Sequence, residues 1–238
     1  METTLHRQLK ELYADGDARF EAPVAGFRID VVSGGQLVEI QHGSLAAIRD
    51  KVASLVKDHR VLVVKPVVIR KRIINHAIRG GPVLSSRLSP RQGSVLDLFH
   101  ELIYFTRVFP HQNLCLEVPL VDIEELRHPG HGRRRRWRRR DHQVADQRLV
   151  KIHHVHRFRT GRDLASLLPA ELPTLFHTGQ LAEGLAVPRW VAQQIAYCFR
   201  KMHLCENSRS RIRENSGRSL AKRRKSHDFR YEPVPAVA

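Results

Sequence analysis

The chain has 238 residues, of which 42% are hydrophobic, so it can form one large domain or two small ones and is not typical of a fully disordered protein. Lysine and arginine number 41 against 24 acidic residues, and the formal net charge of +17 favours a polyanionic partner, most simply nucleic acid, with an anionic membrane surface as the alternative. No run of about 18 apolar residues exists, so we expect no membrane-spanning segment.

Cysteine and histidine usage predicts no zinc site. Cys115, Cys198 and Cys205 are odd in number and lack metal-ligand spacing, which is typical of reduced cysteines. The densest histidine cluster, residues 153–156, has no cysteine or acidic partner at zinc-finger spacing, so these histidines are adventitious or face nucleic acid. The polar N-terminus also lacks the apolar core of a signal peptide, and we expect a cytoplasmic, nucleoid-associated protein.

The first part of the chain predicts a mixed arrangement of helices and strands. Leu5, Leu9 and Leu12 have the spacing of an amphipathic helix. Gly34 and Gly35 supply the positive φ of a tight turn between strands rich in aliphatic residues. The predicted elements are a helix over 3–14, strands over 20–24, 27–32 and 37–41, a helix over 45–57 and a strand over 61–64. The last strand follows a helical crossover and is expected to be parallel to its neighbour.

Two carboxylates and one amide lie in the predicted hairpin. Because side chains alternate along a strand, Glu39 and Gln41 share one face and Ile40 lies on the other. Asp30, on the paired strand, is flanked by apolar residues and would be partly desolvated, a cost that a nearby cation offsets. Carboxylates on adjacent strands can hold Mg²⁺ or Mn²⁺ through oxygen ligands. Two solvent-facing acids in an ordinary hairpin would give the same pattern.

The order α-β-β-β-α-β, with Asp30 on the second strand and Glu39-x-Gln41 on the third, resembles the PD-(D/E)xK nuclease superfamily, the fold of many restriction endonucleases and archaeal Holliday-junction resolvases. The resemblance covers roughly residues 1–70. It implies an α/β fold with a restriction-endonuclease-like core and a mixed sheet. It also implies that Asp30 and Glu39 bind the metal ion and are catalytic.

The same resemblance assigns two further catalytic positions. The family's lysine, which positions or activates the attacking water, falls on Gln41, so this glutamine would orient the water instead. Several members carry an acid on the first helix, and Glu2 lies near the leucine face of that helix. A solvated N-terminal residue is the other interpretation of Glu2. Lys65 would either supply the missing positive charge or simply end its strand.

The middle of the chain predicts a helix over 95–108 and two strands, over 114–127 and 148–152. Between the strands lies a basic hairpin insertion, residues 128–142, whose arginines surround one tryptophan and cannot be buried. Arginine matches phosphate oxygens bidentately and tryptophan can stack on a base, although a localisation signal or a solvated arm is the alternative. The residues predicted to contact DNA here are Arg133, Arg134, Arg135, Arg136, Trp137, Arg138, Arg139 and Arg140.

The C-terminal part predicts a short helix over 178–185, capped by Thr178, and a longer one from Pro188 through His203. This is helix-turn-helix geometry, and residues 181–192 resemble a winged-helix domain, whose second helix enters the major groove. A wing would begin at 204–206, whereas a helical hairpin packed on the nuclease domain is the alternative. The residues predicted to contact DNA on the second helix are Arg189, Gln193, Gln194, Arg200 and Lys201.

These patterns together predict a nuclease-like domain over 1–158, a mainly helical winged-helix-like domain over 159–231 and a loose tail over 232–238. The predicted function is a Mg²⁺- or Mn²⁺-dependent DNA endonuclease acting on double-stranded or branched DNA, with a homodimer as a possible state and no membrane partner. A catalytically inactive nuclease-fold protein that binds DNA or acts as a regulator is the alternative. A nuclease or binding protein for RNA is a third interpretation.

Overall fold

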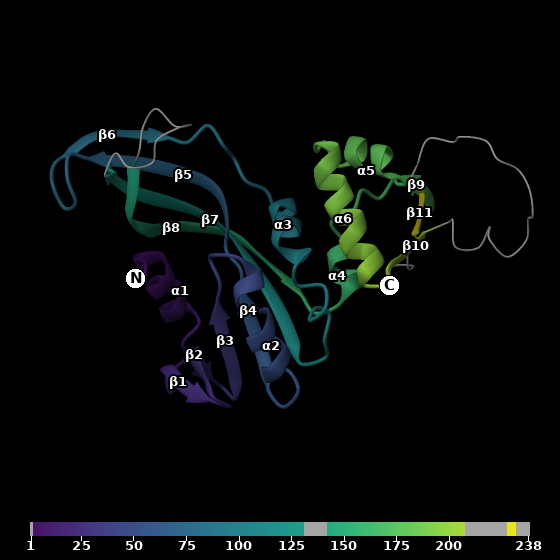
Figure 1. The fold of residues 1–238 in the computed structure, drawn as a ribbon, viewed down its shortest axis with the longest axis horizontal. Helices are drawn as coiled ribbons and strands as arrows, with labels where there is room; N and C mark the ends of the chain where they lie inside the picture. The colour runs from purple at the N-terminus through teal and green to yellow at the C-terminus, as the bar shows by residue number, and fades with distance from the viewer. Residues whose placement is uncertain (1, 131–141, 208–227, 232–238) are drawn as a thin grey trace, which may run out of the picture. The chain divides into compact units, whose positions relative to one another are not determined.

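The computed structural model describes residues 2–130, 142–207 and 228–231 (Figure 1). The chain forms two compact units, one of Met1–Asp97 with Asn113–Arg157 and the other of Leu98–Gln112 with Phe158–Ala238. The predicted α/β class with a mixed sheet is confirmed. Within the described ranges, no helix is long and apolar enough to cross a membrane.

The first unit is built on one mixed sheet with strand order β1-β2-β3-β4-β7-β5-β6, and β8 pairs with β7. Its elements are α1 (Thr4–Leu12), β1 (Arg19–Val24), β2 (Phe27–Ser33), β3 (Gln36–Ile40), the 3₁₀ helix η1 (Leu45–Ala47), α2 (Arg49–Leu55), β4 (Arg60–Val64), β5 (Val67–His76), β6 (Val83–Leu88), β7 (Leu114–Pro129) and β8 (His142–Phe158). The predicted order α-β-β-β-α-β is confirmed, as is the parallel pairing of β3 with β4.

The hairpin of β2 and β3 places its apolar residues in a buried cluster beneath α1. Leu5 and Leu9 of α1 are fully buried and belong to the same core as Val31, Val38 and Ile40. Gly34 and Gly35 have φ of 54° and 74°, as a tight turn requires. Since Ile40 belongs to the core that contains the α1 leucines, Glu39 projects from the other face of β3, as the alternation predicts.

The helix predicted over 95–108 is much shorter in the structure. A 3₁₀ helix, η2 (Val95–Leu98), leads into α3 (Phe99–Leu102), and turns follow. The aromatic and β-branched residues after α3 are weak helix formers, and the turns bury Phe105 and Phe109 completely. Tertiary packing of large side chains therefore overrides the helical periodicity in this segment.

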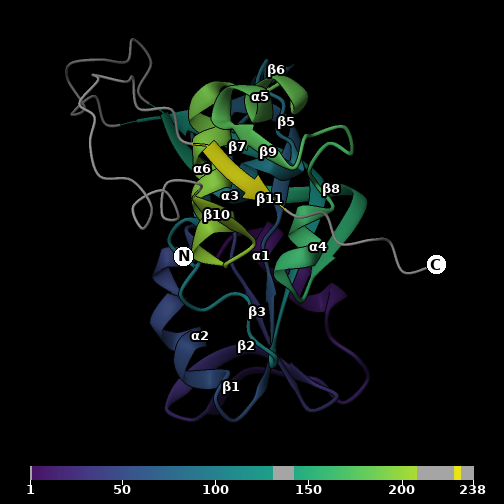
Figure 2. The same ribbon diagram turned by 90° about the vertical axis from the view of Figure 1, so that its right-hand side faces the viewer.

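The second unit combines short helices with a small antiparallel sheet of order β10-β11-β9 (Figure 2). Its further elements are α4 (Gly161–Ala165), β9 (Leu175–His177), α5 (Thr178–Gly184), α6 (Arg189–Lys201), β10 (Cys205–Asn207) and β11 (Asp228–Tyr231). The predicted caps differ by one residue, because His177 caps α5 and Pro188 is the N-cap of α6.

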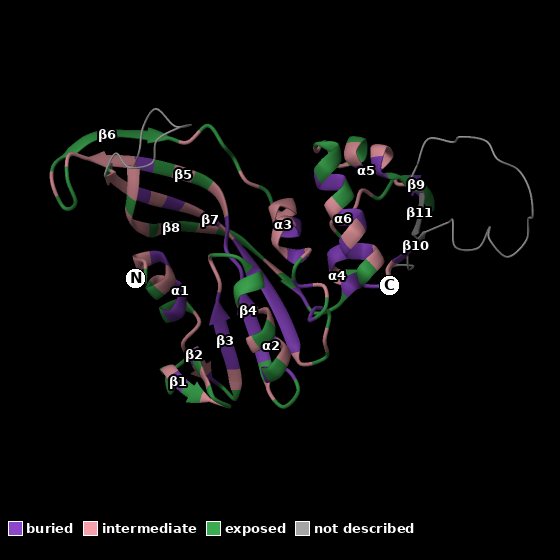
Figure 3. Ribbon diagram, in the orientation of Figure 1, coloured by how far each residue is buried: buried purple, intermediate pink, exposed green. Residues whose placement is uncertain are grey.

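One face of α6 forms the core of the second unit and the other face is exposed (Figure 3). Val191, Ile195 and Phe199 are buried, as the apolar stripe of the sequence predicts. Phe199 meets Phe99 of α3 edge to face, with ring centroids 5.7 Å apart. Residues 98–112 thus supply core to a unit whose other residues begin 46 positions later in the chain, at Phe158.

Candidate functional site

Asp30 lies where the ladder between β2 and β3 ends. The paired residues run from Ser33 and Gln36 to Val31 and Val38. Beyond them, Asp30 Oδ2 accepts a hydrogen bond of 2.8 Å from the backbone N–H of Ile40, so its carboxylate takes the place of a backbone acceptor. The other oxygen, Oδ1, lies 3.2 Å from His6 Nε2 of α1.

Glu39 lies on β3 opposite the position of Asp30 on β2, one step beyond the Val31–Val38 pair. It is almost completely buried, with 4% of its surface exposed. Lys51 of α2 reaches it, with 2.5 Å between Nζ and Glu39 Oε1. The contact is a close ion pair between a buried carboxylate and a partly buried ammonium group. Lys51 Nζ also donates to the carbonyl of Arg28, 2.5 Å away.

The two carboxyl groups have pKa values displaced in opposite directions. Burial raises the pKa of Glu39, and the attraction of Lys51 only partly offsets this effect. Burial also acts to raise the pKa of Asp30, but the bonds from His6 and from the Ile40 N–H outweigh it and hold that pKa below its ordinary value. Two neighbouring acids with separated pKa values can therefore take different roles in one reaction.

Glu2 joins this group through its neighbours on α1. Its Oε1 lies 3.9 Å from His6 Nε2, so one imidazole nitrogen lies between the carboxylates of Glu2 and Asp30. Glu2 also pairs with Lys10, 2.6 Å away, and Lys10 in turn pairs with Glu21 of β1. Glu2 precedes α1, whose N-cap is Thr3, so it does not lie on the helix as predicted, but His6 links it to Asp30.

Gln41 and Lys65 are engaged with the turn that follows β3. Gln41 Nε2 donates to the carbonyl of Ser44 at 2.6 Å. Lys65 is buried and donates to the carbonyls of His42 and Gly43, at 2.9 and 2.5 Å. The cation that pairs with Glu39 is therefore Lys51, and the sequence did not reveal it.

Sequence reasoning missed His6 and Lys51 because both come from helices that precede or follow the hairpin. The available signal was weak: His6 follows Glu2 by four residues, and Lys51 lies one position before Val52 of the apolar face of α2. Across the residues that the structure describes, no group of three or more histidine, cysteine or acidic side chains is arranged to hold a metal ion. The predicted metal ligands Asp30 and Glu39 instead contact His6, the Ile40 N–H and Lys51.

The predicted DNA contacts fall in two places. The basic run, Arg133, Arg134, Arg135, Arg136, Trp137, Arg138, Arg139 and Arg140, lies outside the described residues. On α6, the predicted residues lie off the buried face: Arg189, Gln193 and Lys201 are exposed, and Gln194 and Arg200 are partly buried. These α6 side chains belong to the second unit, whereas Asp30 and Glu39 belong to the first.

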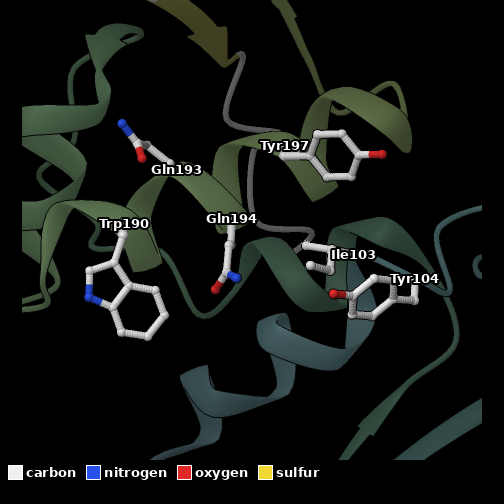
Figure 4. Close-up of a pocket in the computed structure, with 6 residues that line it drawn as sticks. All are labelled: Ile103, Tyr104, Trp190, Gln193, Gln194 and Tyr197. Atoms are coloured by element: carbon white, nitrogen blue, oxygen red, sulfur yellow. The ribbon is translucent and has the colours of Figure 1, made fainter. Parts of the chain in front are cut away.

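The outer face of α6 also carries an open pocket of about 470 Å³ (Figure 4). Trp190 packs flat on His100 of α3, with ring centroids 4.8 Å apart and planes 15° apart. His100 Nδ1 also makes a hydrogen bond of 2.5 Å with Gln194 Oε1. The sequence analysis did not identify this pocket, because its walls come from segments about ninety residues apart. The residues that line it are Ile103, Tyr104, Trp190, Gln193, Gln194 and Tyr197.

Comparison with known proteins gives a family without an assigned function. The family described as "Domain of unknown function (DUF8091)" matches residues 3–159. The chain is also similar to an uncharacterized protein of Treponema pallidum (strain Nichols), with 29% identity over 183 residues that cover 76% of this chain and 72% of the relative. No solved structure gives a significant match.

Proposed function

We propose that this chain, which belongs to the DUF8091 family, is a metal-dependent endonuclease that hydrolyses phosphodiester bonds in DNA. The observation that carries the proposal is the pair of carboxyl groups, Asp30 and Glu39, at the end of the β2–β3 ladder, with pKa values displaced in opposite directions. The net charge of +17 favours a polyanionic substrate.

The carboxylates fit a hard divalent cation. Mg²⁺ is commonly held by one or two protein carboxylates together with substrate phosphates and water, so two acids are enough. Glu39 would bind the cation beside or in place of Lys51, whose Nζ lies 2.5 Å from Glu39 Oε1. A bound Mg²⁺ or Mn²⁺ would lower the pKa of an attacking water and stabilise charge on the phosphate.

The residues around the pair have supporting roles in this proposal. Lys51 lies beside Glu39 and would stabilise the negative phosphate, which is the work expected of a lysine that this chain lacks at position 41. Gln41, with its amide nitrogen bound to Ser44, would orient the attacking water through its side-chain oxygen. Glu2 would complete the site by holding His6 against Asp30.

We propose a winged-helix-like DNA-binding module for the second unit. In support, α5 and α6 follow one another across a short turn, and β10 and β11, which come after α6 in the chain, pair antiparallel as the strands of a wing would. The exposed Arg189, Gln193 and Lys201 are suited to phosphates and base edges. Replacing the arginines of residues 133–140 with serine should weaken binding to every DNA sequence and flatten its salt dependence.

Cleavage of plasmid and branched DNA in Mg²⁺ or Mn²⁺ tests the nuclease proposal. Asp30→Asn and Glu39→Gln should each reduce the cleavage rate at least about a hundredfold, because a lost metal ligand removes several kcal/mol of transition-state stabilisation. Asp50→Asn is the matched control, since that acid lies on the exposed surface of α2. Wild-type rates in both variants would show that the hairpin is not the active site.

One observation favours the alternative of an inactive nuclease-fold protein that binds DNA. Gln41 stands at the lysine position, and its amide is held by the carbonyl of Ser44 as a turn-stabilising group would be. Under this alternative, Lys51 and Glu39 form a structural ion pair. Tight, salt-sensitive DNA binding without cleavage in either metal would favour this alternative over the nuclease.

A further inference from the structure

The pocket on α6 has the composition of a site for a flat, polar ring. Three of its six lining residues are aromatic, two are glutamines and one is aliphatic. Trp190 and Tyr104 are 54% and 53% exposed, which is unusual for side chains of their size unless a partner covers them. Binding sites for small planar groups combine such apolar walls with a few convergent polar groups.

We propose that this pocket binds an unpaired nucleobase of single-stranded or branched DNA. The choice of DNA as the polymer rests on the proposed function, whereas the shape and chemistry of the pocket carry the assignment of a base. The proposal concerns only the second unit, because all the lining residues belong to it.

The aromatic walls are held in place before any ligand arrives. Trp190 stacks on His100 with an interplanar angle of 15°, which fixes the plane of the indole. An indole stacked through one face can receive a second ring on its other face, and stacking on a base is favourable for every base. Tyr104, which also lines the pocket, comes from the turn after α3, so two separate segments supply the walls (Figure 4).

The amides give the pocket hydrogen-bonding groups for the edge of a base. Gln194 is fixed by its bond to His100, and Gln193 lies on the same exposed side of α6. A glutamine amide offers both a donor and an acceptor, which matches the paired groups on a base edge. In a base pair most of those groups are already used, so an unpaired base gains more from this pocket.

Positive charge lies beside the pocket, where a sugar–phosphate backbone would run. The Arg200 guanidinium and the Lys201 ammonium lie 5.8 and 5.9 Å from the centroid of the Tyr197 ring, which lines the pocket. Phosphates on either side of a seated base would meet these cations. A neutral aromatic ligand would gain nothing from them, so charge complementarity favours a nucleotide polymer.

Base stacking inside a continuous duplex keeps both faces of each base covered. Only a base at a fork, a flap, a gap or in a single strand can enter between aromatic side chains without the cost of unstacking and unpairing. The second unit should therefore prefer DNA with unpaired bases over an intact duplex of the same length.

The test measures binding of the full chain to a labelled single strand, a forked duplex and an intact duplex by fluorescence anisotropy in EDTA. Trp190→Ala and Tyr104→Ala should each weaken binding to the single strand and the fork about tenfold, while duplex affinity changes less than twofold. Phe20→Ala, an equally exposed aromatic on β1, is the matched control and should change neither.

Equal losses on the duplex and the single strand, or no loss on either, would overturn the base-binding site. Preference for RNA of the same sequence, lost with Trp190→Ala, would overturn DNA as the ligand. Because EDTA removes divalent metal, a failed nuclease assay does not affect this result. Conversely, an unchanged Trp190→Ala variant says nothing against cleavage at Asp30 and Glu39.

Discussion

The site around Asp30 and Glu39 on the hairpin and the pocket on α6 differ in what they bury and what they expose. At the hairpin, charged groups are buried: Glu39 is 4% exposed and is balanced by Lys51. On α6, aromatic rings are exposed: Trp190 is more than half accessible and is held by His100. Burying a carboxylate favours its pairing with a cation, whereas exposing an aromatic ring favours stacking with a ligand. Under the proposed function, the first unit would hold the reactive groups and the second would hold an unpaired base of the substrate.

The largest stability effect should come from removing the cation at the hairpin. Lys51→Met should lower the free energy of unfolding by about 2 kcal/mol at pH 8, because it leaves Glu39 buried without its partner. Burial already raises the Glu39 pKa above its ordinary 4.5, so the cost of its charge grows as pH rises through the folded value and is absent at lower pH. Denaturant titrations at pH 8 and pH 4 measure the difference.

Lys57→Met is the control for this substitution, since Lys57 is exposed just after α2. It should leave stability within about 0.5 kcal/mol of wild type at both pH values. A Lys51→Met loss that is the same at pH 4 and pH 8 would mean that packing, and not the Glu39 charge, explains the contribution of Lys51.

The two carboxyl groups should respond to neutralisation with opposite signs. Asp30→Asn should lower stability at pH 7 by about 1.5 kcal/mol, the ordinary value of a hydrogen bond to a charged group. Because the folded pKa of Asp30 is depressed, its contribution is present above its unfolded pKa and is lost as pH falls through the folded value. Glu39→Gln should instead leave stability unchanged or raise it by about 1 kcal/mol at pH 7, as replacements of strained functional groups often do.

Thermal melts of both variants at pH 7 and pH 3 check these signs. Destabilisation by Glu39→Gln as large as that of Asp30→Asn would contradict the separation of the two pKa values. In that case the charge of Asp30 would not be stabilised by its neighbours more than the buried charge of Glu39 is.

The smallest effect should come from His100, which supports the pocket. His100→Ala removes the ring under Trp190 and the bond to Gln194, and should lower stability by about 1 kcal/mol while weakening single-strand binding severalfold. His100→Phe keeps a ring and loses the hydrogen bond, so comparing the variants separates the two contacts. Single-strand binding by His100→Ala as tight as by wild type would show that stacking on His100 is not needed to position Trp190.

The hairpin was predictable because residues close together in the sequence determine its structure. Alternation, a glycine turn and the short separation of Asp30 from Glu39 specify which side chains share a face. His6 and Lys51 could not be placed, because contacts between a helix and a sheet depend on packing angles that sequence spacing does not encode. The helix over 95–108 was wrong for a related reason: its aromatic residues satisfy the second unit's core in turns as well as in a helix.

The pocket was out of reach of sequence reasoning because Tyr104 and Trp190 lie far apart along the chain. The exposed set on α6, by contrast, followed from the period of one helix, and its buried stripe is confirmed. The hairpin and α6, each formed by one continuous stretch, were therefore predictable, and the pocket assembled from distant stretches was not.

The insertion of residues 98–112 into the second unit has a consequence for how this protein can be divided. The chain passes from one unit to the other at three points, after Asp97, Gln112 and Arg157, so no single cut separates them. A fragment beginning at Phe158 would leave Phe199 without Phe99. The family match, residues 3–159, contains that phenylalanine but ends before α6. Recombination that moved residues 3–159 alone would therefore also move residues 98–112, which form part of the core of the second unit.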